Sequence, residues 1–343
     1  QSFADAYNYF DALWPGYSPI GQTERLRITG HIQKEQEREA GDLLNHCIGP
    51  LFYRVRKSEL GLAPQDFLPP RVIPMNPNER RIYDAIVAKI RAAALNDDFD
   101  EFELVTRLKQ GRMMRLRQCV SYSKLLGTAV TQYDENLLKD TPSLSNTIAH
   151  YDQLEVPAKL EVTLGLLRGL RDKGEKVLIW SNFVGTLKLL REAINKAGHR
   201  VELIYGGTPV ENTEDSDELT RERIIQDFKT ANGIEVLVAN PAACAESISL
   251  HTACSNAIYY DLSYNCAQYL QSLDRIHRVG GSEDKIAHYH FLQYEDTIDQ
   301  DILASLRRKA DNMSAVIDEE CPVYSLDMFS PEDELAAYER LFG

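Results

Sequence analysis

The sequence lacks the two elements with which ATP-hydrolysing enzymes commonly hold magnesium and the nucleotide phosphates. No segment has the pattern G-x-x-x-x-G-K-[ST] of a phosphate-binding loop, and no predicted strand ends in an Asp-Glu pair that could hold magnesium. A chain without these elements cannot hold Mg-ATP in the way that this class of enzyme requires. We therefore expect the chain alone to be inactive, and any ATP chemistry to need a further domain.

Long apolar runs, paired cysteines and an excess of positive charge are missing as well. No apolar run approaches the roughly 20 residues that span a bilayer, and no leader pattern precedes the first helix, so we expect a cytoplasmic protein without a membrane partner. No two cysteines have C-x-x-C spacing, which argues against a metal site. The net charge of −14 argues against a surface coated for nucleic acid, although a local basic cluster can still contact phosphates.

What the sequence does contain, from Lys159 onward, is a regular alternation of apolar runs and amphipathic segments. With helices between them, strands are predicted at 176–180, 201–205, 235–239, 257–260 and 286–292. This alternation predicts an α/β fold, a doubly wound parallel sheet flanked by helices and RecA-like in outline. Its ligands would bind in the loops at the carboxyl ends of the strands. Clustered carboxylates are missing from those loops, which argues against a nuclease.

The part of the chain before this lobe is predicted to be helical. A helix is predicted over 76–95 and a second one continues to about Leu126, whereas residues 127–156 are polar and read as a connector with little regular structure. The second helix carries a basic run that includes Arg112 and Arg115. Such a run is usually a solvated face, and the alternative is that these arginines lie beside a DNA backbone.

The most informative stretch is residues 257–281, AIYYDLSYNCAQYLQSLDRIHRVGG. It predicts a buried strand, a loop, and a helix that ends near Gly280. On that helix Gln271, Arg275 and Arg278 have the spacing i, i+4, i+7 and share one face. Single arginines are commonly solvated or paired with acids, but this face, just past a strand end, is also where an α/β sheet would hold a phosphate ligand.

This stretch resembles the last helicase motif of the Swi/Snf-type ATPases, a branch of the superfamily two helicases, with the pattern D-x-x-x-N-x-x-x-x-x-Q-x-x-x-R-x-H-R-x-G. The sequence departs from the family at Gly281, where Gln is usual. The resemblance implies that Gln271, Arg275 and Arg278 bind ATP and that the two arginines are catalytic, acting on the γ-phosphate. The matching residues are Asp261, Asn265, Gln271, Arg275, His277, Arg278 and Gly280.

Three further segments resemble motifs of the same family. WSNF (180–183) is similar to F-S-Q-F, YGGT (205–208) to a G-x-T motif, and LVANPAACAESISL (237–250) to L-L-S-T-x-A-G-G-x-G-x-N-L. In the last segment Cys244, Ala245 and Ser247 replace glycines, which predicts a less close approach of a phosphate to the backbone. The resemblance implies nucleic-acid contacts at Ser181, Asn182, Gly207, Thr208, Arg221, Asn240 and Ser249.

The resemblance continues toward the N-terminus and suggests a division into four parts. Residues 51–72, with Arg54, Lys57 and the Leu-Pro-Pro element at 68–70, resemble the junction between two motor lobes, and a Pro-rich surface linker is a compatible interpretation. Residues 115–126 resemble the family segment L-R-Q-x-C-x-x-P-x-L. The predicted parts are the end of a first lobe with the junction, a helical insertion with its connector, a second lobe, and an acidic tail that braces the lobe, at 1–75, 76–156, 157–310 and 311–343.

Taken together, the resemblance implies the C-terminal motor lobe of an ATP-dependent DNA translocase or helicase. A first lobe of the same parent chain would hold ATP and Mg2+, and double-stranded DNA is the expected partner. Because the chain does not begin with Met, we expect it to be a fragment. Strings such as ISLH and YLQSLDRIHR also resemble bacterial genome-defence helicases, which implies subunits of an antiviral defence complex as partners.

Two other functions stay open. A RecA-like lobe without catalysis could serve as a docking module for DNA or protein; the altered segment 240–249 favours this, and the retained arginine pair opposes it. A glycosyltransferase-type domain would bind a nucleotide sugar with its arginines. That function predicts a phosphate-cradling Gly-rich loop and an acid for the ribose, and the sequence has neither.

Overall fold

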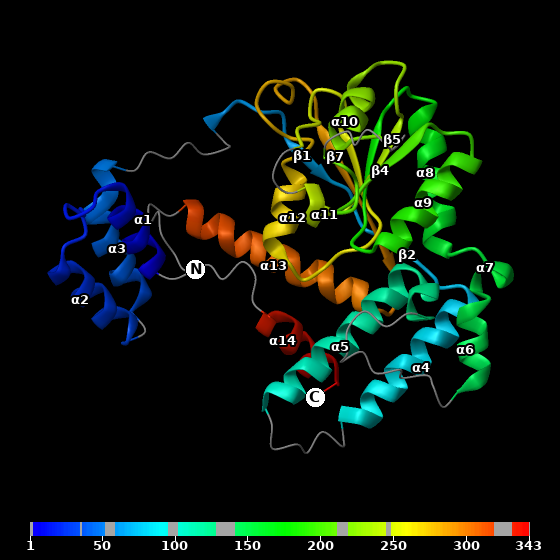
Figure 1. Ribbon diagram of the computed structural model, residues 1–343, viewed down its shortest axis with the longest axis horizontal. Coiled ribbons are helices and arrows are strands. Elements are labelled where there is room, and N and C mark those ends of the chain that lie inside the picture. The colour runs from blue at the N-terminus through cyan, green and yellow to red at the C-terminus, as the bar shows by residue number, and fades with distance from the viewer. Residues whose placement is uncertain are drawn as a thin grey trace. The chain divides into compact units, whose positions relative to one another are not determined.

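The computed structural model, drawn in Figure 1, describes residues 3–34, 36–51, 59–94, 102–127, 141–210, 219–244, 248–318 and 331–342. The chain divides into two compact units, described separately here. The first comprises Gln1–Gly61 with Arg307–Phe329, and the second comprises Leu62–Leu306 with Ser330–Gly343. The four parts predicted from the sequence were defined by their expected functions, whereas the two units are defined by packing. The four-part division therefore stays a prediction.

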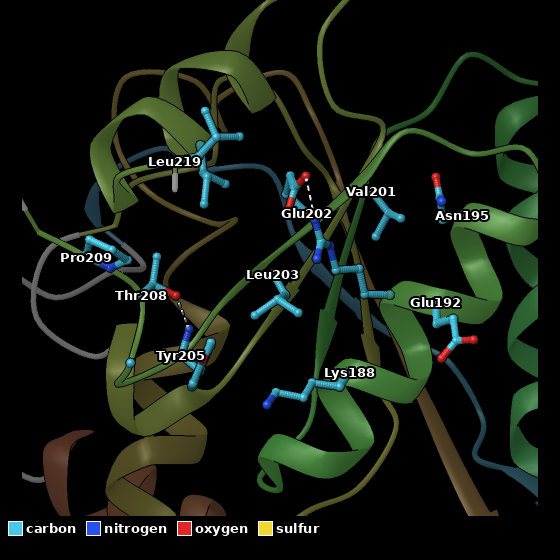
Figure 2. A pocket seen from close by; sticks show the side chains of 13 residues that line it. Lys188, Glu192, Asn195, Val201, Glu202, Leu203, Tyr205, Thr208, Pro209 and Leu219 are labelled. Atoms are coloured by element: carbon cyan, nitrogen blue, oxygen red, sulfur yellow. Dashed lines mark hydrogen bonds and ion pairs between the residues drawn. The ribbon is translucent and has the colours of Figure 1, made fainter. Parts of the chain in front are cut away.

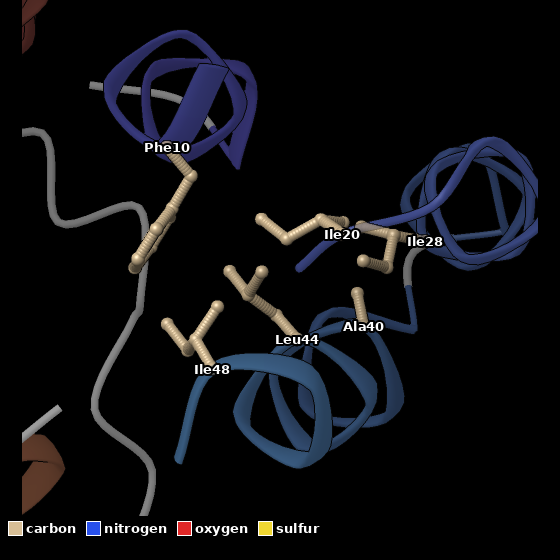
Figure 3. Packing of buried hydrophobic residues seen from close by; sticks show 6 residues of the cluster. All are labelled: Phe10, Ile20, Ile28, Ala40, Leu44 and Ile48. Atoms are coloured by element: carbon tan, nitrogen blue, oxygen red, sulfur yellow. The ribbon is translucent and has the colours of Figure 1, made fainter. Parts of the chain in front are cut away.

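The first unit contains three short helices around a small apolar core. They are α1 (Phe3–Leu13), α2 (Gln22–Ile32) and α3 (Glu37–Ile48), followed by the 3-10 turn η1 (Gly49–Leu51). The sequence did not predict α2, because only Ile28 of this helix is buried and its apolar periodicity is weak. Figure 3 shows the side chains that form the core, which are Phe10, Ile20, Ile28, Ala40, Leu44 and Ile48. Arg54 and Lys57 lie outside the described residues.

The second unit is built on a seven-stranded sheet in which every described pair of strands is parallel. The strand order is β1-β7-β6-β3-β5-β4, and β2 also pairs with β7. Five strands confirm the sequence prediction: β3 (Val177–Trp180), β4 (Val201–Ile204), β5 (Val236–Ala239), β6 (Asn256–Tyr259) and β7 (Ala287–Tyr294). The sequence did not predict β1 (Gln65–Phe67) and β2 (Arg71–Ile73), because three-residue strands beside a Pro-Pro pair carry no detectable alternation.

Burial explains why these segments form strands. All residues of β3, β5 and β6 are buried, and such continuous apolar runs are typical of a parallel sheet covered on both faces. Helices α8 (Ala158–Arg171) and α9 (Val184–Lys196) cover one face, and α10 (Arg221–Lys229), α11 (Pro241–Cys244) and α12 (Cys266–Leu273) cover the other (Figure 1). The RecA-like α/β fold is therefore confirmed.

A group of helices extends this unit beyond the sheet. The long helices α4 (Pro77–Ala94) and α5 (Phe102–Ser121) pack side by side, and α14 (Pro331–Phe342) packs against both (Figure 1). The expected connector was wrong in part, because residues 141–154 fold as α6 (Pro142–Ala149) and α7 (Tyr151–Leu154). Their apolar side chains Leu144, Ile148 and Tyr151 are buried, so tertiary packing overrides the polar composition. The unit is completed by the 3-10 turn η3 (Ser123–Gly127) and the start of α13 (Ile298–Asp318).

A buried ion pair joins this helical group to the sheet. Lys159 of α8 is fully buried, and its Nζ lies 2.6 Å from Oδ2 of Asp299 and donates to the carbonyl of Val120 at 3.0 Å. Glu79 of α4 is also buried and accepts a hydrogen bond from the hydroxyl of Tyr294. Burial raises the pKa of both carboxyl groups. These contacts fix α4, α5 and α8 relative to β7.

Within the described residues, no helix has the length and apolar character of a membrane-spanning segment.

Candidate functional site

The carboxylate of Asp261 lies at the centre of the loops that follow β3 and β6. This side chain is buried, and its two oxygens accept hydrogen bonds from Oγ of Ser121 at 2.7 Å, Oγ of Ser181 at 2.5 Å, and the backbone N–H and side-chain amide of Asn182 at 2.8 and 2.9 Å. Ser121 belongs to α5 and also lies 2.7 Å from Oγ1 of Thr186. Asp261 therefore joins the helical group to the edge of the sheet where an α/β fold binds its ligands.

Asn240 extends this network to the end of β5. Its side-chain amide donates to the carbonyl of Asn182 at 2.8 Å, and its Oδ1 accepts from the N–H of Ala242 at 2.9 Å. The structure therefore brings Ser181, Asn182 and Asn240 together, as their positions after neighbouring strands predict. Their side chains, however, are already bonded: those of Ser181 and Asn182 to Asp261, and that of Asn240 to the backbone carbonyl of Asn182. The prediction that Ser181 contacts nucleic acid through its hydroxyl does not fit, because the residue is fully buried.

The loop after β4 presents two more of the predicted residues. Gly207 is exposed, and a Cβ atom there would lie 2.7 Å from the ring of Tyr205, so a larger residue would require this ring to move. Thr208 is largely buried, and its Oγ1 accepts the N–H of Tyr205 at 3.0 Å. Arg221 is half-buried and donates to the carbonyl of Ala243 at 3.2 Å. The geometry gives Arg221 a role in joining two loops.

A cavity of about 820 Å3 lies beside this loop, along the outer edge of β4. Figure 2 shows its lining side chains, with Lys188 of α9 opposite the Tyr205–Thr208 turn. Lys188 is exposed, and its ammonium group makes no ion pair with any described residue, whereas Arg191 on the same helix lies 3.1 Å from Glu202. Sequence reasoning missed Lys188, because nothing distinguishes one surface lysine until the fold places it beside a glycine turn.

The arginine segment departs from the predicted geometry. Helix α12 ends at Leu273, so Arg275 and Arg278 lie in the turns that follow it, and the prediction that they share a helix face with Gln271 was wrong. Beyond the end of α12, tertiary contacts hold the chain. Ile276 and His277 are buried, and Nε2 of His277 lies 2.7 Å from the carbonyl of Ala63, which precedes β1.

Arg275 and Arg278 differ in how much of the guanidinium group is free to bind a ligand. Arg275 is half-buried, and its guanidinium donates to the carbonyl groups of Gln271 at 3.0 Å and Ile248 at 3.1 Å. The Arg278 side chain is exposed and makes no hydrogen bond or ion pair with the described residues, and Gln271 is exposed as well. Ser249 is half-buried, with Oγ 2.8 Å from Nδ1 of His251. Arg278 is therefore the guanidinium that can meet a phosphate without first breaking a contact.

The basic run on α5 does not fit the predicted DNA contact. Arg112, Arg115 and Arg117 are all buried. The guanidinium of Arg112 donates to the hydroxyl of Tyr338 at 3.1 Å, and that of Arg117 lies 2.9 Å from a carboxylate oxygen of Glu334, both on α14. Arg115 donates to Oε1 of Gln118 at 3.0 Å. Long cationic side chains here pack the helical group, because their aliphatic stems cover apolar surface while their ends find oxygen partners.

The site contains positive charge and few groups that could hold a metal. No cluster of three or more His, Cys, Asp or Glu side chains able to bind a metal ion occurs in the described part of the chain. Burial raises the pKa of the Cys244 thiol to about 12, so this cysteine is a packing residue and no nucleophile.

Comparison with known proteins supports this architecture. Residues 158–280 match the helicase conserved C-terminal domain. The chain is 23% identical to the SWI/SNF-related matrix-associated actin-dependent regulator of chromatin subfamily A containing DEAD/H box 1 homolog of Caenorhabditis elegans, over 85% of this chain and 31% of that protein. It is 29% identical to Helicase SWR1 of Saccharomyces cerevisiae, over 45% of this chain and 10% of that protein. The chain thus spans a third or less of these relatives.

Two solved structures share the fold. The C-terminal part of the Fun30 ATPase domain has a TM-score of 0.54 and 19% identity, with 82% of this chain and 97% of that chain covered. The Sulfolobus solfataricus SWI2/SNF2 ATPase core in complex with dsDNA also has a TM-score of 0.54, with 18% identity and 90% and 57% covered. The resemblance to the C-terminal lobe of Swi/Snf-type ATPases is therefore confirmed.

Proposed function

We propose that this chain is the C-terminal motor lobe of an ATP-dependent DNA translocase or helicase. A first lobe would hold ATP and Mg2+, and this lobe would close on the nucleotide and supply a guanidinium to its γ-phosphate. The helicase domain at 158–280 and the relatives named above support a motor lobe. The finer assignment of residues rests on the geometry of the site.

The exposed Arg278 is the observation that carries this proposal. It follows α12 and lies beside segments that precede β1, β6 and β7, and no described residue neutralises its guanidinium. A guanidinium is planar, permanently charged and able to bind two phosphate oxygens at once. Arginine fingers of this kind contribute roughly 10³–10⁵ in rate in related phosphoryl-transfer enzymes. Arg275, which binds two carbonyl groups of its own chain, would mainly shape the turn that carries Arg278.

The proposed DNA contacts lie in the loops after β3, β4 and β5. Asn182, Gly207, Thr208, Asn240 and Ser249 stay candidates for backbone-phosphate contacts. The N–H groups of Asn182, Thr208 and Asn240 already donate within the protein, so contacts there would replace existing hydrogen bonds. Phosphate contacts of this kind position a protein on DNA without reading the bases. We add Lys188 to this surface, because it faces the cavity beside Gly207 and Thr208 (Figure 2). The solved SWI2/SNF2 core in complex with dsDNA makes duplex DNA the first ligand to test.

The experiment that tests the proposal is ATP hydrolysis by a two-lobe protein that contains this chain, measured with and without double-stranded DNA. We expect turnover that duplex DNA stimulates, and no turnover by this chain alone. Turnover that does not respond to DNA would contradict the motor function.

The second candidate is a docking module without catalysis, and one observation favours it. The side chains of Ser181 and Asn182 bond to Asp261 and that of Asn240 to the carbonyl of Asn182, so this edge of the sheet presents few free polar groups. A docking module would bind DNA or protein with the same affinity whether Arg278 is present or replaced. The motor would lose turnover. A role in antiviral defence rests on sequence resemblance alone and stays a prediction.

A further inference from the structure

The turn that carries Arg278 is fixed from behind by residues 248–252. The N–H of Leu250 donates to the carbonyl of Arg275 at 2.9 Å, and the guanidinium of Arg275 donates to the carbonyl of Ile248 at 3.1 Å. Two hydrogen bonds therefore join the segment after α11 to the segment after α12. They end at Arg275, three residues before the exposed guanidinium, so the position of Arg278 depends on what holds residues 278–281.

The ring of His251 lies against the glycine pair that follows Arg278. A Cβ atom at Gly281 would lie 2.8 Å from Cδ2 of His251, and one at Gly280 would lie 3.7 Å from its Nε2. The ring is itself oriented by Oγ of Ser249, 2.8 Å from Nδ1. Gly280 also has a φ of +91°, a conformation that side chains other than glycine rarely adopt. The imidazole therefore fills the space that a side chain at Gly281 would need.

Other contacts hold the backbone of the same turn. The carboxylate of Glu283 accepts the N–H groups of Gly280 and Gly281, both at 2.7 Å, and Oγ of Ser282 accepts the N–H of Arg278 at 3.0 Å. The backbone amides of 278, 280 and 281 are thus all bonded. With the amides bonded and the ring of His251 behind Gly281, the side chain of Arg278 is the exposed, unbonded part of the turn.

We propose that His251 is a positioning residue for Arg278, and that it acts by packing on Gly280 and Gly281. This inference rests on the proposed function, since it assumes that the location of the Arg278 guanidinium limits turnover. Burial of the imidazole, together with the positive charge of Arg278, holds the pKa of His251 below its usual value. The Swi/Snf-type pattern has Gln where this chain has Gly281, so the pairing of His251 with a glycine is a feature of this chain.

A double-mutant cycle tests the contact directly. In a two-lobe protein that contains this chain, Gly281→Ala places a methyl group 2.8 Å from the ring and moves the turn. We expect kcat for DNA-stimulated ATP hydrolysis to fall by roughly 10- to 100-fold, because small misplacements of a catalytic group cost this much, while KM for DNA stays unchanged. His251→Ala alone leaves Arg278 loosely held and lowers kcat by a smaller factor.

The double variant His251→Ala/Gly281→Ala separates positioning from simple loss of packing. We expect its kcat to exceed that of Gly281→Ala, since the ring that clashes is gone. The recovery is partial, because the added Cβ also lies 3.2 and 3.3 Å from Cγ2 and Cα of Thr252. The control is Gly165→Ala in α8, where a Cβ meets nothing within 4 Å, and which should keep full activity.

The outcomes are distinct. Losses that multiply in the double variant, or a Gly281→Ala variant with wild-type kcat, would refute the role of His251 and leave the motor function standing. A wild-type protein without DNA-stimulated turnover would refute the proposed function and this inference with it. Thermal unfolding of each variant, measured in parallel, shows whether a fall in kcat follows from loss of fold.

Discussion

His290 gives the sharpest prediction about stability, because its ring is buried without a polar partner. The residue lies in β7, is 8% exposed, and neither ring nitrogen has a hydrogen-bond partner among the described residues. Burial, with further contributions from the positive charge of Arg71, His288 and Lys173 and an opposing one from Asp66, lowers the pKa of His290 from 6.5 to about 4. The folded protein therefore keeps this imidazole neutral over a pH range in which an unfolded chain protonates it.

The sign of the effect follows from proton uptake. Between pH 6.5 and about 4 the unfolded state binds the proton at His290 and the folded state does not, so this residue lowers the free energy of unfolding as the pH falls through that range. At about 1.4 kcal/mol per pH unit, the full loss is about 3 kcal/mol. The replacement His290→Leu removes the titrating group and keeps an apolar side chain in the sheet.

Urea unfolding at a series of pH values measures this directly. We expect the free energy of unfolding of wild type to fall relative to that of His290→Leu as the pH drops from 6.5 to 4, by up to about 3 kcal/mol. Other histidines titrate in both proteins, so the difference isolates His290. At pH 7 the variant should be at least as stable as wild type, because no buried imidazole is left without partners. Parallel curves for the two proteins over this range would refute the reasoning.

Two further predictions concern the buried ion pair and the phosphate surface. Lys159→Met leaves Asp299 buried without its cation and should destabilise the chain by about 3–5 kcal/mol. In urea unfolding, the double variant Lys159→Met/Asp299→Asn should be more stable than this single variant. Equal stability of the two variants would contradict a penalty caused by the unpaired charge. Lys188→Gln should weaken the salt dependence of duplex DNA binding. The slope of the logarithm of the binding constant against the logarithm of the salt concentration should become less negative by about 1, as expected for one lost phosphate contact. Lys196→Gln on the same helix, where the lysine pairs with Glu192, should leave that slope unchanged, and an equal loss in both variants would refute a specific role of Lys188.

Local sequence patterns predicted the parts of the fold that depend on local rules. Strands β3 and β5 are continuous apolar runs between helices, and this pattern is typical of a covered parallel sheet. The loops after the strands were also predicted to meet at one edge, because parallel strands end there together. The match to a motif located Arg278 without any structural information.

The sequence could not predict contacts between distant segments. The chain leaves α12 at Leu273, and His277 then contacts Ala63, which is more than 200 residues away in the sequence. The burial of Arg112 depends on α14, which lies at the other end of the chain. From its charge pattern alone, α5 could be interpreted only as a solvated helix or as a DNA-binding one. Neither interpretation predicts that α14 covers its arginines. For the same reason the sequence did not predict the hydrogen bonds of Asp261, because its partners come from separate elements.

Arg275 and Arg278 differ in their contacts, and this difference decides which of them tests the proposed catalytic role. Arg275 binds carbonyl groups of Gln271 and Ile248, so replacing it would disturb the turn as well as any contact to ATP. Arg278 is exposed, and its replacement by alanine should leave the fold intact. Loss of activity in Arg278→Ala can therefore be assigned to the missing guanidinium.

The most direct test of the account is single-turnover ATP hydrolysis by the Arg278→Ala variant of a two-lobe protein, with the protein in excess over ATP and at saturating duplex DNA. We predict a rate constant lower by roughly 10³ or more, with nearly unchanged ATP affinity and an unchanged unfolding midpoint. A rate constant within about threefold of wild type would show that this lobe supplies no catalytic charge through Arg278, and would contradict the central claim.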